Sequence, residues 1–417
     1  MTATIPPITV PGDKSIAHRA LIFAALARGE SRLRNLPAGL DVRSTQRALR
    51  ALGVGFREDG DALVVTGSGG ALTAPAEPID CGNSGTTIRL LSGVLATRDL
   101  TVTLDGDDSL RSRPMRRIAQ PLAAFGARLD LSPNGTAPFV LHGNGAAPGA
   151  EVEIAIASAQ IKSAVLLAAL NAHGRTRVHG LLATRDHTER LFGTFGIAFA
   201  HEDGALVVDG PQTPHAMDFD VPGDMSSAAF LLGAAAAVPG ARAVVEDVGL
   251  NPTRTAFLDV LRRFGAQVEV TVTHDGAEPR GRVAVVGAPL RAIAVAPDEV
   301  PGVIDELPLV GVLGLFADGT TIVRGAGELR VKESDRIETF ARAGRALGAT
   351  VETFDDGFAV HGPARLRDGA VVTGGDHRIA MAFTVAARVA GVPLRLDDPH
   401  CVAVSFPGFA DALEKVA

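Results

Sequence analysis

A repeated helical pattern constrains the fold of this 417-residue chain more than any other feature. An amphipathic helix that ends in Leu or Phe, then Gly and a small apolar residue, recurs roughly every 70 to 80 residues, which is typical of a fold built from structural repeats. The expected helices lie within 44–54, 114–127, 187–197, 251–266, 334–349 and 407–417. The glycines expected to form helix C-caps with positive φ are Gly53, Gly126, Gly196, Gly265 and Gly348.

A second series of segments alternates with the first and is apolar on most faces, so we expect interior helices there. These segments are 14–29, 83–98, 158–174, 224–240, 305–319 and 376–391. Short β-branched runs, such as 62–67, 100–106 and 281–287, are predicted strands. Any single segment could be an ordinary αβ element, but the phased series predicts a repeating unit of strand, buried helix, strand, amphipathic helix, strand and strand.

The two halves of the chain echo each other, because VPGDKSIA at 10–17 returns as VPGDMSSA at 221–228. Three units in each half are therefore expected, and the length of the chain favours two domains.

Composition excludes several classes of protein. The chain has no Trp and no Tyr, a net charge of −7 and only scattered Phe, so a nucleic-acid partner is not expected. Cys81 and Cys401 are its two cysteines, which predicts neither a metal site nor a disulfide framework. We see no secretion signal and no apolar stretch of about 20 residues, so no membrane association and a cytoplasmic location are expected.

Polar residues gather where the expected buried helices begin. They are Lys14-Ser15, Asn83-Ser84-Gly85, Ser158-Ala159-Gln160, Asp224, Asp305-Glu306 and Asp376-His377-Arg378. Ser, Asp and Asn are common helix caps, but a cation at a helix N-terminus opposes the macrodipole unless an anion lies between them. Lys14 and Arg378 therefore predict a bound phosphate or carboxylate.

Further cations cluster on expected loops. They are Arg111, Arg113, Arg116, Arg185, Arg330, Lys332 and Arg336. A solvated helix face explains any single cluster equally well. The sequence contains no phosphate loop of the Walker or GxGxxG type, so anion binding would depend on these side chains.

Short motifs occur in a defined order between residues 11 and 409. They are PGDKSIAHR, CGNSGTTIRLL, DDSLRSRPM, SAQIKSA, TRDHTER, VPGDMSSAAFLL, NPTR, IDELPLV, LRVKESDR, GGDHRIA and VSFPGF. The chain in this respect resembles the 3-phosphoshikimate 1-carboxyvinyltransferases, and the resemblance covers nearly its whole length.

The resemblance implies an α/β fold, a two-domain inside-out α/β barrel of six βαβαββ units with three in each domain. The implied domains are 13–222 and 1–12 with 223–417, joined by two crossovers near the PGD motifs, with the active site in the cleft between them. The implied reaction transfers the carboxyvinyl group of phosphoenolpyruvate to the 5-hydroxyl of shikimate 3-phosphate and releases phosphate. A monomer without metal or other cofactor is expected, with these two small molecules as its partners.

The same resemblance assigns substrate contacts to residues within the matching motifs. Those expected for shikimate 3-phosphate are Lys14, Ser15, Arg19, Ser158, Ala159, Gln160, Thr184, Arg185, Asp305 and Lys332. Those expected for phosphoenolpyruvate are Lys14, Asn83, Gly85, Arg113, Gln160, Glu333, Arg336, His377 and Arg378.

The candidate catalytic residues are Asp305, Glu333 and Lys14. Asp305 is expected to open a helix, whose amides would keep its carboxylate ionised and able to accept the hydroxyl proton. Glu333 is the candidate for protonating C3 of phosphoenolpyruvate, although the two roles could be exchanged. Lys14 is expected to neutralise the oxygen that leaves with the phosphate.

The chain departs from the family pattern at one cation, because Val404 stands where other members carry a Lys. The SAQ and TRDH segments resemble the branch of the family that lacks an aromatic platform under the ring. Gly85 leaves room beside the expected phosphoenolpyruvate site, where a larger residue would disfavour bulkier analogues such as glyphosate.

The sequence disfavours two other functions. The UDP-N-acetylglucosamine 1-carboxyvinyltransferases typically have Asn after the first-helix Lys and a loop cysteine in the second unit, whereas this chain has Ser15 and no Cys within 103–125. A non-catalytic clamp built from repeats would scatter its cations, whereas these gather at helix starts together with Asp305 and Glu333.

Overall fold

The computed structural model describes residues 6–416, and the chain divides into two compact units. The continuous unit is Lys14–Val221, and the split unit combines the segment before Lys14 with Pro222 and the residues that follow it. Each unit has its own hydrophobic core.

Three sheets of the continuous unit share one arrangement, in which a parallel pair at one edge is followed by two antiparallel neighbours. The first has the order β12 (Phe219–Asp220), β1 (Arg28–Arg34), β3 (Ala62–Ser68), β2 (Gly55–Asp59). The second has the order β4 (Ile79–Asp80), β5 (Thr101–Asp105), β7 (Phe139–His142), β6 (Arg128–Asp130). The third has the order β8 (Glu151–Ile154), β9 (Gly174–Gly180), β11 (Ala205–Gly210), β10 (Ala200–Glu202).

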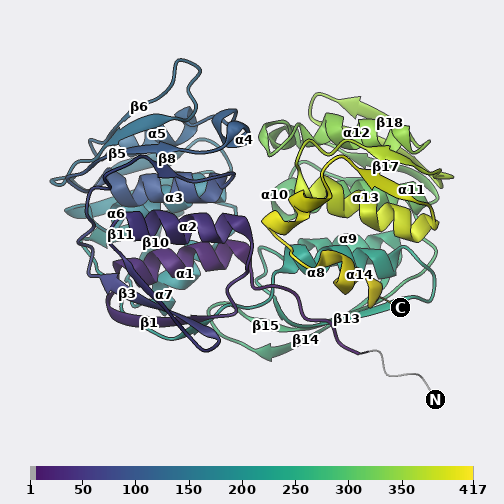
Figure 1. Cartoon of the computed structure of the whole chain (residues 1–417), viewed down its shortest axis with the longest axis horizontal. Helices are drawn as coiled ribbons and strands as arrows, with labels where there is room; N and C mark the ends of the chain where they lie inside the picture. Colours follow the sequence, from purple (N-terminus) through teal and green to yellow (C-terminus); the bar gives the residue numbers. More distant parts are fainter. Residues whose placement is uncertain (1–5, 417) are drawn as a thin grey trace. The chain divides into compact units, whose positions relative to one another are not determined.

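Two kinds of helix lie within this unit, and Figure 1 shows them between its sheets. The apolar helices, buried along nearly their whole length, are α1 (Lys14–Leu26), α3 (Gly85–Ala96) and α6 (Ala159–Ala169). The amphipathic helices are α2 (Leu40–Ala51), α5 (Arg116–Ala123) and α7 (His187–Thr194), with a short α4 (Asp108–Arg111). The predicted alternation of buried and amphipathic helices is confirmed, because a helix that is apolar on every face can only be satisfied inside a core.

The split unit repeats this pattern (Figure 1). Its first sheet has the order β13 (Arg242–Gly249), β15 (Arg280–Val286), β14 (Gln267–His274). The second has the order β16 (Ala294–Val295), β17 (Gly319–Val323), β19 (Gly357–Gly362), β18 (Thr350–Phe354). The third pairs β20 (Gly369–Val371) with β21 (Leu394–Leu396). Its buried helices are α8 (Met225–Ala236), α11 (Leu307–Phe316) and α13 (His377–Ala390). The other helices are α9 (Ala256–Phe264), α10 (Val300–Val303), η1 (Gly327–Val331), α12 (Arg336–Ala346), η2 (Pro399–Val404) and α14 (Phe409–Glu414).

Six repeats of the predicted order are therefore present, and the last is shortened to a two-stranded sheet. The expected inside-out α/β architecture holds for both units. The five predicted C-cap glycines all have positive φ, and Gly265 at φ 112 is the left-handed C-cap of α9.

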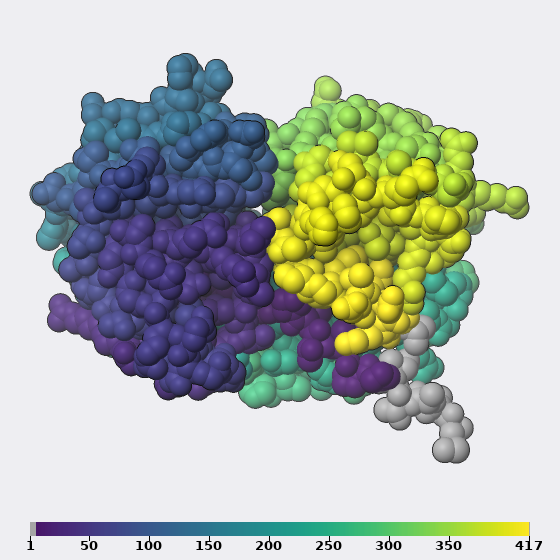
Figure 2. All heavy atoms as spheres, in the orientation of Figure 1, coloured from purple at the N-terminus to yellow at the C-terminus, as the bar shows by residue number. Residues whose placement is uncertain are grey.

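The first repeat of each unit takes its opening strand from a segment distant in sequence. β12 pairs in parallel with β1, with Leu33 opposite Phe219. In the split unit Ile8 bridges Val245 of β13 in parallel. Figure 2 shows purple atoms from the beginning of the described chain among the teal atoms of the split unit. The chain accordingly passes from one unit to the other twice, at Asp13–Lys14 and at Val221–Pro222.

Within residues 6–416, we find no helix that has both the length and the apolar character needed to span a membrane.

Candidate active site

Lys14 is the first residue of α1, and it contacts a carboxylate from the next helix. Its Nζ lies 2.8 Å from Oδ2 of Asp41, which belongs to the first turn of α2. An anion therefore does neutralise the cation at this helix start, but it is supplied by the protein. A bound anion at Lys14 stays a prediction, and the pairing partner 27 residues away is one that a local pattern cannot reveal.

A chain of buried hydrogen-bonded side chains connects α1, α2 and α3. His18 Nδ1 lies 2.6 Å from Thr45 Oγ1, which in turn lies 2.7 Å from Thr87 Oγ1. Thr87 also donates to the hydroxyl of Ser84, the N-cap of α3. Because these groups are buried, their hydrogen bonds fix the positions of α1, α2 and α3 relative to one another.

Asn83, Gly85, Arg113 and Gln160, all expected to contact phosphoenolpyruvate, lie around the start of α3. Arg113 donates to Asn83 Oδ1 at 2.6 Å, and Arg89 donates to Gln160 Oε1 at 2.6 Å. A Cβ added to Gly85 would lie 2.9 Å from Arg89 Nη1 and 3.1 Å from Arg113 Nη1. The space beside Gly85 is thus occupied by two guanidinium groups, so a side chain there would displace cations.

Arg19 connects three helices of the continuous unit. Its Nε donates to Thr188 of α7 at 2.7 Å, its Nη2 to Ser163 of α6 at 2.6 Å, and its Nη1 to the backbone oxygen of Ser15 at 2.8 Å. The side chain is buried. It therefore holds the N-terminal halves of α1, α6 and α7 beside one another.

The remaining shikimate 3-phosphate residues of this unit occupy two adjacent segments. Ser158 is the N-cap of α6, and Ala159 and Gln160 are its first residues. Thr184 and Arg185 lie in the segment between β9 and α7. We name residues 181–186 the β9–α7 loop.

In the split unit, Arg336 is buried among carboxylates. Its Nε donates to Asp376 Oδ2 at 2.8 Å, its Nη2 to Glu333 Oε2 at 2.6 Å, and its Nη1 lies 3.5 Å from Asp305 Oδ1. Burial alone would lower the pKa of Arg336, but the neighbouring carboxylates, Asp376 foremost, outweigh burial and hold the pKa above its ordinary value. Arg336 consequently stays charged and contacts both candidate catalytic carboxylates.

Asp305 lies in the turn between α10 and α11, one residue before the N-cap Glu306. Its carboxylate is 3.5 Å from Arg336, 3.6 Å from Arg378 and 4.0 Å from Arg254. Asp305 thus lies one residue before the cap, and not at the start of the helix as expected. Three guanidinium groups within 4.0 Å favour its ionised form, because opposite charges nearby stabilise it.

Arg378 lies in the first turn of α13 and also has partners within the protein. Its Nη2 lies 3.6 Å from Asp305 Oδ2 and its Nη1 3.9 Å from Glu306 Oε1. A bound anion at Arg378 stays a prediction, as at Lys14. His377 is the buried first residue of α13, and Lys332 follows η1 beside Glu333.

Arg254 is the centre of a second buried cluster in the split unit. It donates to Asp224 Oδ1 at 3.1 Å and to Ser226 Oγ at 2.6 Å, and it lies 3.7 Å from Asp13 Oδ2. Burial and the neighbouring Asp13 carboxylate raise the pKa of Asp224 to about 6. Burial alone would lower the pKa of Arg254, but the carboxylates around it raise the pKa above its usual value.

The raised pKa of Asp224 predicts a pH dependence of stability. A carboxyl group whose pKa is higher in the folded than in the unfolded protein binds its proton more tightly when folded. Its contribution to the free energy of unfolding therefore falls as pH rises from about 4 to about 6. Asp224→Asn should remove this pH-dependent decrease in the free energy of unfolding, which is on the order of 1–3 kcal/mol. An Asn at this position can still cap α8. Urea unfolding at several pH values measures it, and parallel pH profiles for the two proteins would contradict the prediction.

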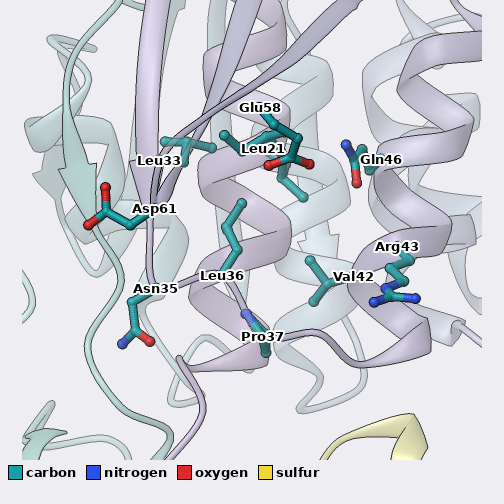
Figure 3. A pocket seen from close by; sticks show the side chains of 11 residues that line it. Leu21, Leu33, Asn35, Leu36, Pro37, Val42, Arg43, Gln46, Glu58 and Asp61 are labelled. Atoms are coloured by element: carbon teal, nitrogen blue, oxygen red, sulfur yellow. The ribbon is translucent and has the colours of Figure 1, made fainter.

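The continuous unit also contains a hollow of about 240 Å³ away from these contacts (Figure 3). Leu21 of α1 and Val42, Arg43 and Gln46 of α2 are among the residues that line it. None of the expected substrate residues does. The candidate site therefore depends on the helix starts and not on this hollow.

The expected residues thus form two groups, one in each unit. Val404, which replaces the expected Lys, ends η2. Several buried charged residues near the two groups were not among the predicted site residues, and these are Asp41, Arg89, Lys162, Glu189, Arg254, Glu306 and Asp376. Arg89 and Lys162 had a detectable signal, since each is a single cation inside an otherwise apolar helix. Glu306 and Asp376 were noted only as polar residues at helix starts, where acidic residues are common.

The repeated βαβαββ units, with charged residues at the starts of their buried helices, define the class of two-unit inside-out α/β barrels. A solved member of this class is the enolpyruvyl transferase NikO from Streptomyces tendae, with a TM-score of 0.77, 19% identity and coverage of 99% of this chain and 94% of that one. At this identity the similarity shows the fold alone.

More specific similarities identify the family. The family model described as EPSP synthase (3-phosphoshikimate 1-carboxyvinyltransferase) matches residues 5–413. A 3-phosphoshikimate 1-carboxyvinyltransferase from Thermotoga neapolitana is 47% identical over 98% of this chain and 96% of its own length, and one from Bacillus subtilis is 41% identical with the same coverage. The structure of EPSP synthase from Acinetobacter baumannii has a TM-score of 0.85 and 36% identity, covering 99% of this chain and 95% of that one. This chain belongs to the EPSP synthase family.

Proposed function

We propose that this chain transfers the carboxyvinyl group of phosphoenolpyruvate to the 5-hydroxyl of shikimate 3-phosphate and releases phosphate. One observation carries the proposal. The residues of the family motifs form two groups of cations that are ion-paired or hydrogen-bonded within the protein, one around the starts of α1, α3 and α6 and one around the starts of α11 and α13. The relatives of known name support the same reaction over 98% of the chain.

The charges of the two groups suit these substrates. Two phosphates and a carboxylate bring several negative charges, and guanidinium groups bind such anions in bidentate geometry. Lys14, Arg113 and Arg378 already contact carboxylate or amide oxygens of the protein. We infer that a substrate anion takes the place of these internal partners. Before a substrate binds, the internal partners hold these cations near the positions in which they would bind it.

We propose that both groups serve one active site, as the family resemblance implies. Exclusion of water from that site would strengthen each charge interaction within it. A monomeric, cytoplasmic enzyme that acts on these two small molecules without a cofactor completes the proposal.

Asp305 and Glu333 are the proposed proton carriers. As the 5-hydroxyl oxygen bonds to C2 of phosphoenolpyruvate, Asp305 accepts the hydroxyl proton and Glu333 gives a proton to C3. The C2–O bond to phosphate then breaks, C3 loses a proton to Glu333, and Lys14 neutralises the departing oxygen. Arg336 contacts both carboxylates, at 3.5 Å and 2.6 Å, so one guanidinium group positions the pair. The acid and base roles of these two residues can be exchanged without changing this balance.

Phosphate release tests the proposal. Purified protein should release phosphate when shikimate 3-phosphate and phosphoenolpyruvate are both present, and neither substrate alone should suffice. UDP-N-acetylglucosamine in place of shikimate 3-phosphate should give no release. Release with the nucleotide sugar, or none with shikimate 3-phosphate, would overturn the proposed reaction.

A further inference from the structure

Lys162 is a buried cation to which the reaction described above gives no role. It lies on α6, one turn beyond Ser158, and its side chain is only 1% exposed. Its backbone N donates to the Ser158 carbonyl at 3.0 Å, within the regular helix. An ammonium group buried to this extent is costly unless its donors are satisfied.

The ammonium group of Lys162 has three partners on the neighbouring segment. It lies 2.6 Å from Oε1 of Glu189 in α7, and it donates to the carbonyl oxygens of Leu182 at 3.2 Å and Thr184 at 3.4 Å. An ammonium group has three donor hydrogens, and these three acceptors match that number. One side chain therefore connects α6, the β9–α7 loop and α7.

The β9–α7 loop has little regular structure of its own. It contains no helix or strand, and Leu181 at its start is 52% exposed. Local hydrogen bonds run from Leu182 N to the Gly180 carbonyl and from Thr184 N to the Leu182 carbonyl. Irregular segments of this kind are held in one conformation by contacts with the rigid elements beside them. The Lys162 ammonium group supplies two such contacts from α6.

A second connection runs beside the first, between the sequence neighbours of the same two residues. Arg19 donates to Ser163, which follows Lys162, and to Thr188, which precedes Glu189. Ser163 Oγ and Thr188 Oγ1 are themselves 2.7 Å apart. Since this second connection already joins α6 to α7, the distinctive contribution of Lys162 is its contact with the loop.

We propose that Lys162 and Glu189 are positioning residues that hold the β9–α7 loop against the start of α6 and thereby set the affinity for the phosphate of shikimate 3-phosphate. This inference rests on the proposed function, in which Ser158 and Gln160 on α6 and Thr184 in the loop surround that phosphate. Neither Lys162 nor Glu189 needs to touch the substrate. The loop carbonyls fix where Thr184 and its neighbours lie.

Lys162→Met should raise KM for shikimate 3-phosphate about 10-fold or more, because two loop carbonyls lose a charged donor. KM for phosphoenolpyruvate and kcat should change by no more than about 3-fold, since the pair lies on the shikimate 3-phosphate side of the site and outside the reacting groups. This single variant should also be less stable. Glu189 keeps a buried carboxylate without its cation, and its Oε2 has no hydrogen-bond partner in the structure.

The double variant Lys162→Met with Glu189→Leu separates positioning from simple stabilisation. It removes both buried charges, so the melting temperature should return to near that of the wild type. KM for shikimate 3-phosphate should remain raised, because the loop carbonyls still lack their donor. Arg175→Gln is the matched control, since Arg175 of β9 forms an exposed ion pair with Glu202 of β10 in the sheet that precedes the loop. This change should alter the KM of neither substrate.

Amide hydrogen exchange of the ligand-free proteins tests whether Lys162 holds the β9–α7 loop, and it requires no activity assay. Residues 181–186 should exchange faster in both Lys162 variants than in the wild type and the Arg175→Gln control. Unchanged exchange there, or a KM that recovers together with stability in the double variant, would overturn the inference. Wild-type protein that shows no turnover would refute the proposed function, whereas the exchange measurement would still decide whether Lys162 holds the loop.

Discussion

Lys14→Met is expected to lower kcat/KM by about 100-fold to 1,000-fold, the range found when one group that stabilises developing charge is removed. The ammonium group lies at the start of α1, 2.8 Å from Oδ2 of Asp41. In the proposed reaction it is the cation that neutralises the departing phosphate oxygen. Steady-state kinetics with both substrates measure the effect.

Loss of stability must be separated from loss of chemistry in this variant. The side chains of Lys14 and Asp41 are 16% and 8% exposed, so removing the cation leaves a mostly buried carboxylate and should cost about 1–3 kcal/mol. The double variant Lys14→Met with Asp41→Asn should recover most of that stability and none of the activity. Recovery of turnover in the double variant would show that Lys14 acts only through Asp41.

Asp305→Asn is expected to lower kcat by about 100-fold to 10,000-fold, the usual contribution of a positioned acid or base. The dissociation constant for shikimate 3-phosphate should change by no more than about 3-fold, because an amide oxygen can still accept a hydrogen bond from a hydroxyl group. Single-turnover kinetics and calorimetric titration measure the two quantities separately. Equal losses in both would make Asp305 a binding residue.

Glu306→Gln provides the matched control for Asp305. Glu306 is the next residue, is more deeply buried, and contacts the same Arg378 at 3.9 Å. Its carboxylate also accepts from Ser226 in the buried Arg254 cluster. The change should therefore affect stability more than kcat. A fall in kcat as large as that of Asp305→Asn would show that the general charge balance of the cluster matters more than one proton acceptor.

The helices and strands were largely readable from local patterns. The apolar segment 224–240 contains α8, and the β-branched run 62–67 lies within β3. Gly53 and Gly265 both adopt the positive φ that the end of each amphipathic pattern predicted. These agreements arise because burial on one face or on all faces is written into residues that are close in sequence.

The shortened sixth repeat and the exchanged opening strands could not be read in this way. A two-residue strand such as β12 has no periodicity to detect, and its pairing with β1 joins residues that are distant in sequence. The resemblance to a family predicted the two crossovers where local patterns could not.

Sequence alone determined which residues carry charge at the helix starts, and the family motifs named the candidate site residues. Only the tertiary structure decided their partners. Lys14 contacts Asp41, Arg19 contacts Thr188, and Asp305 lies among three arginines from separate elements. A local pattern reports how one segment is buried, whereas a charge pair depends on which distant segments the packed core brings within about 4 Å.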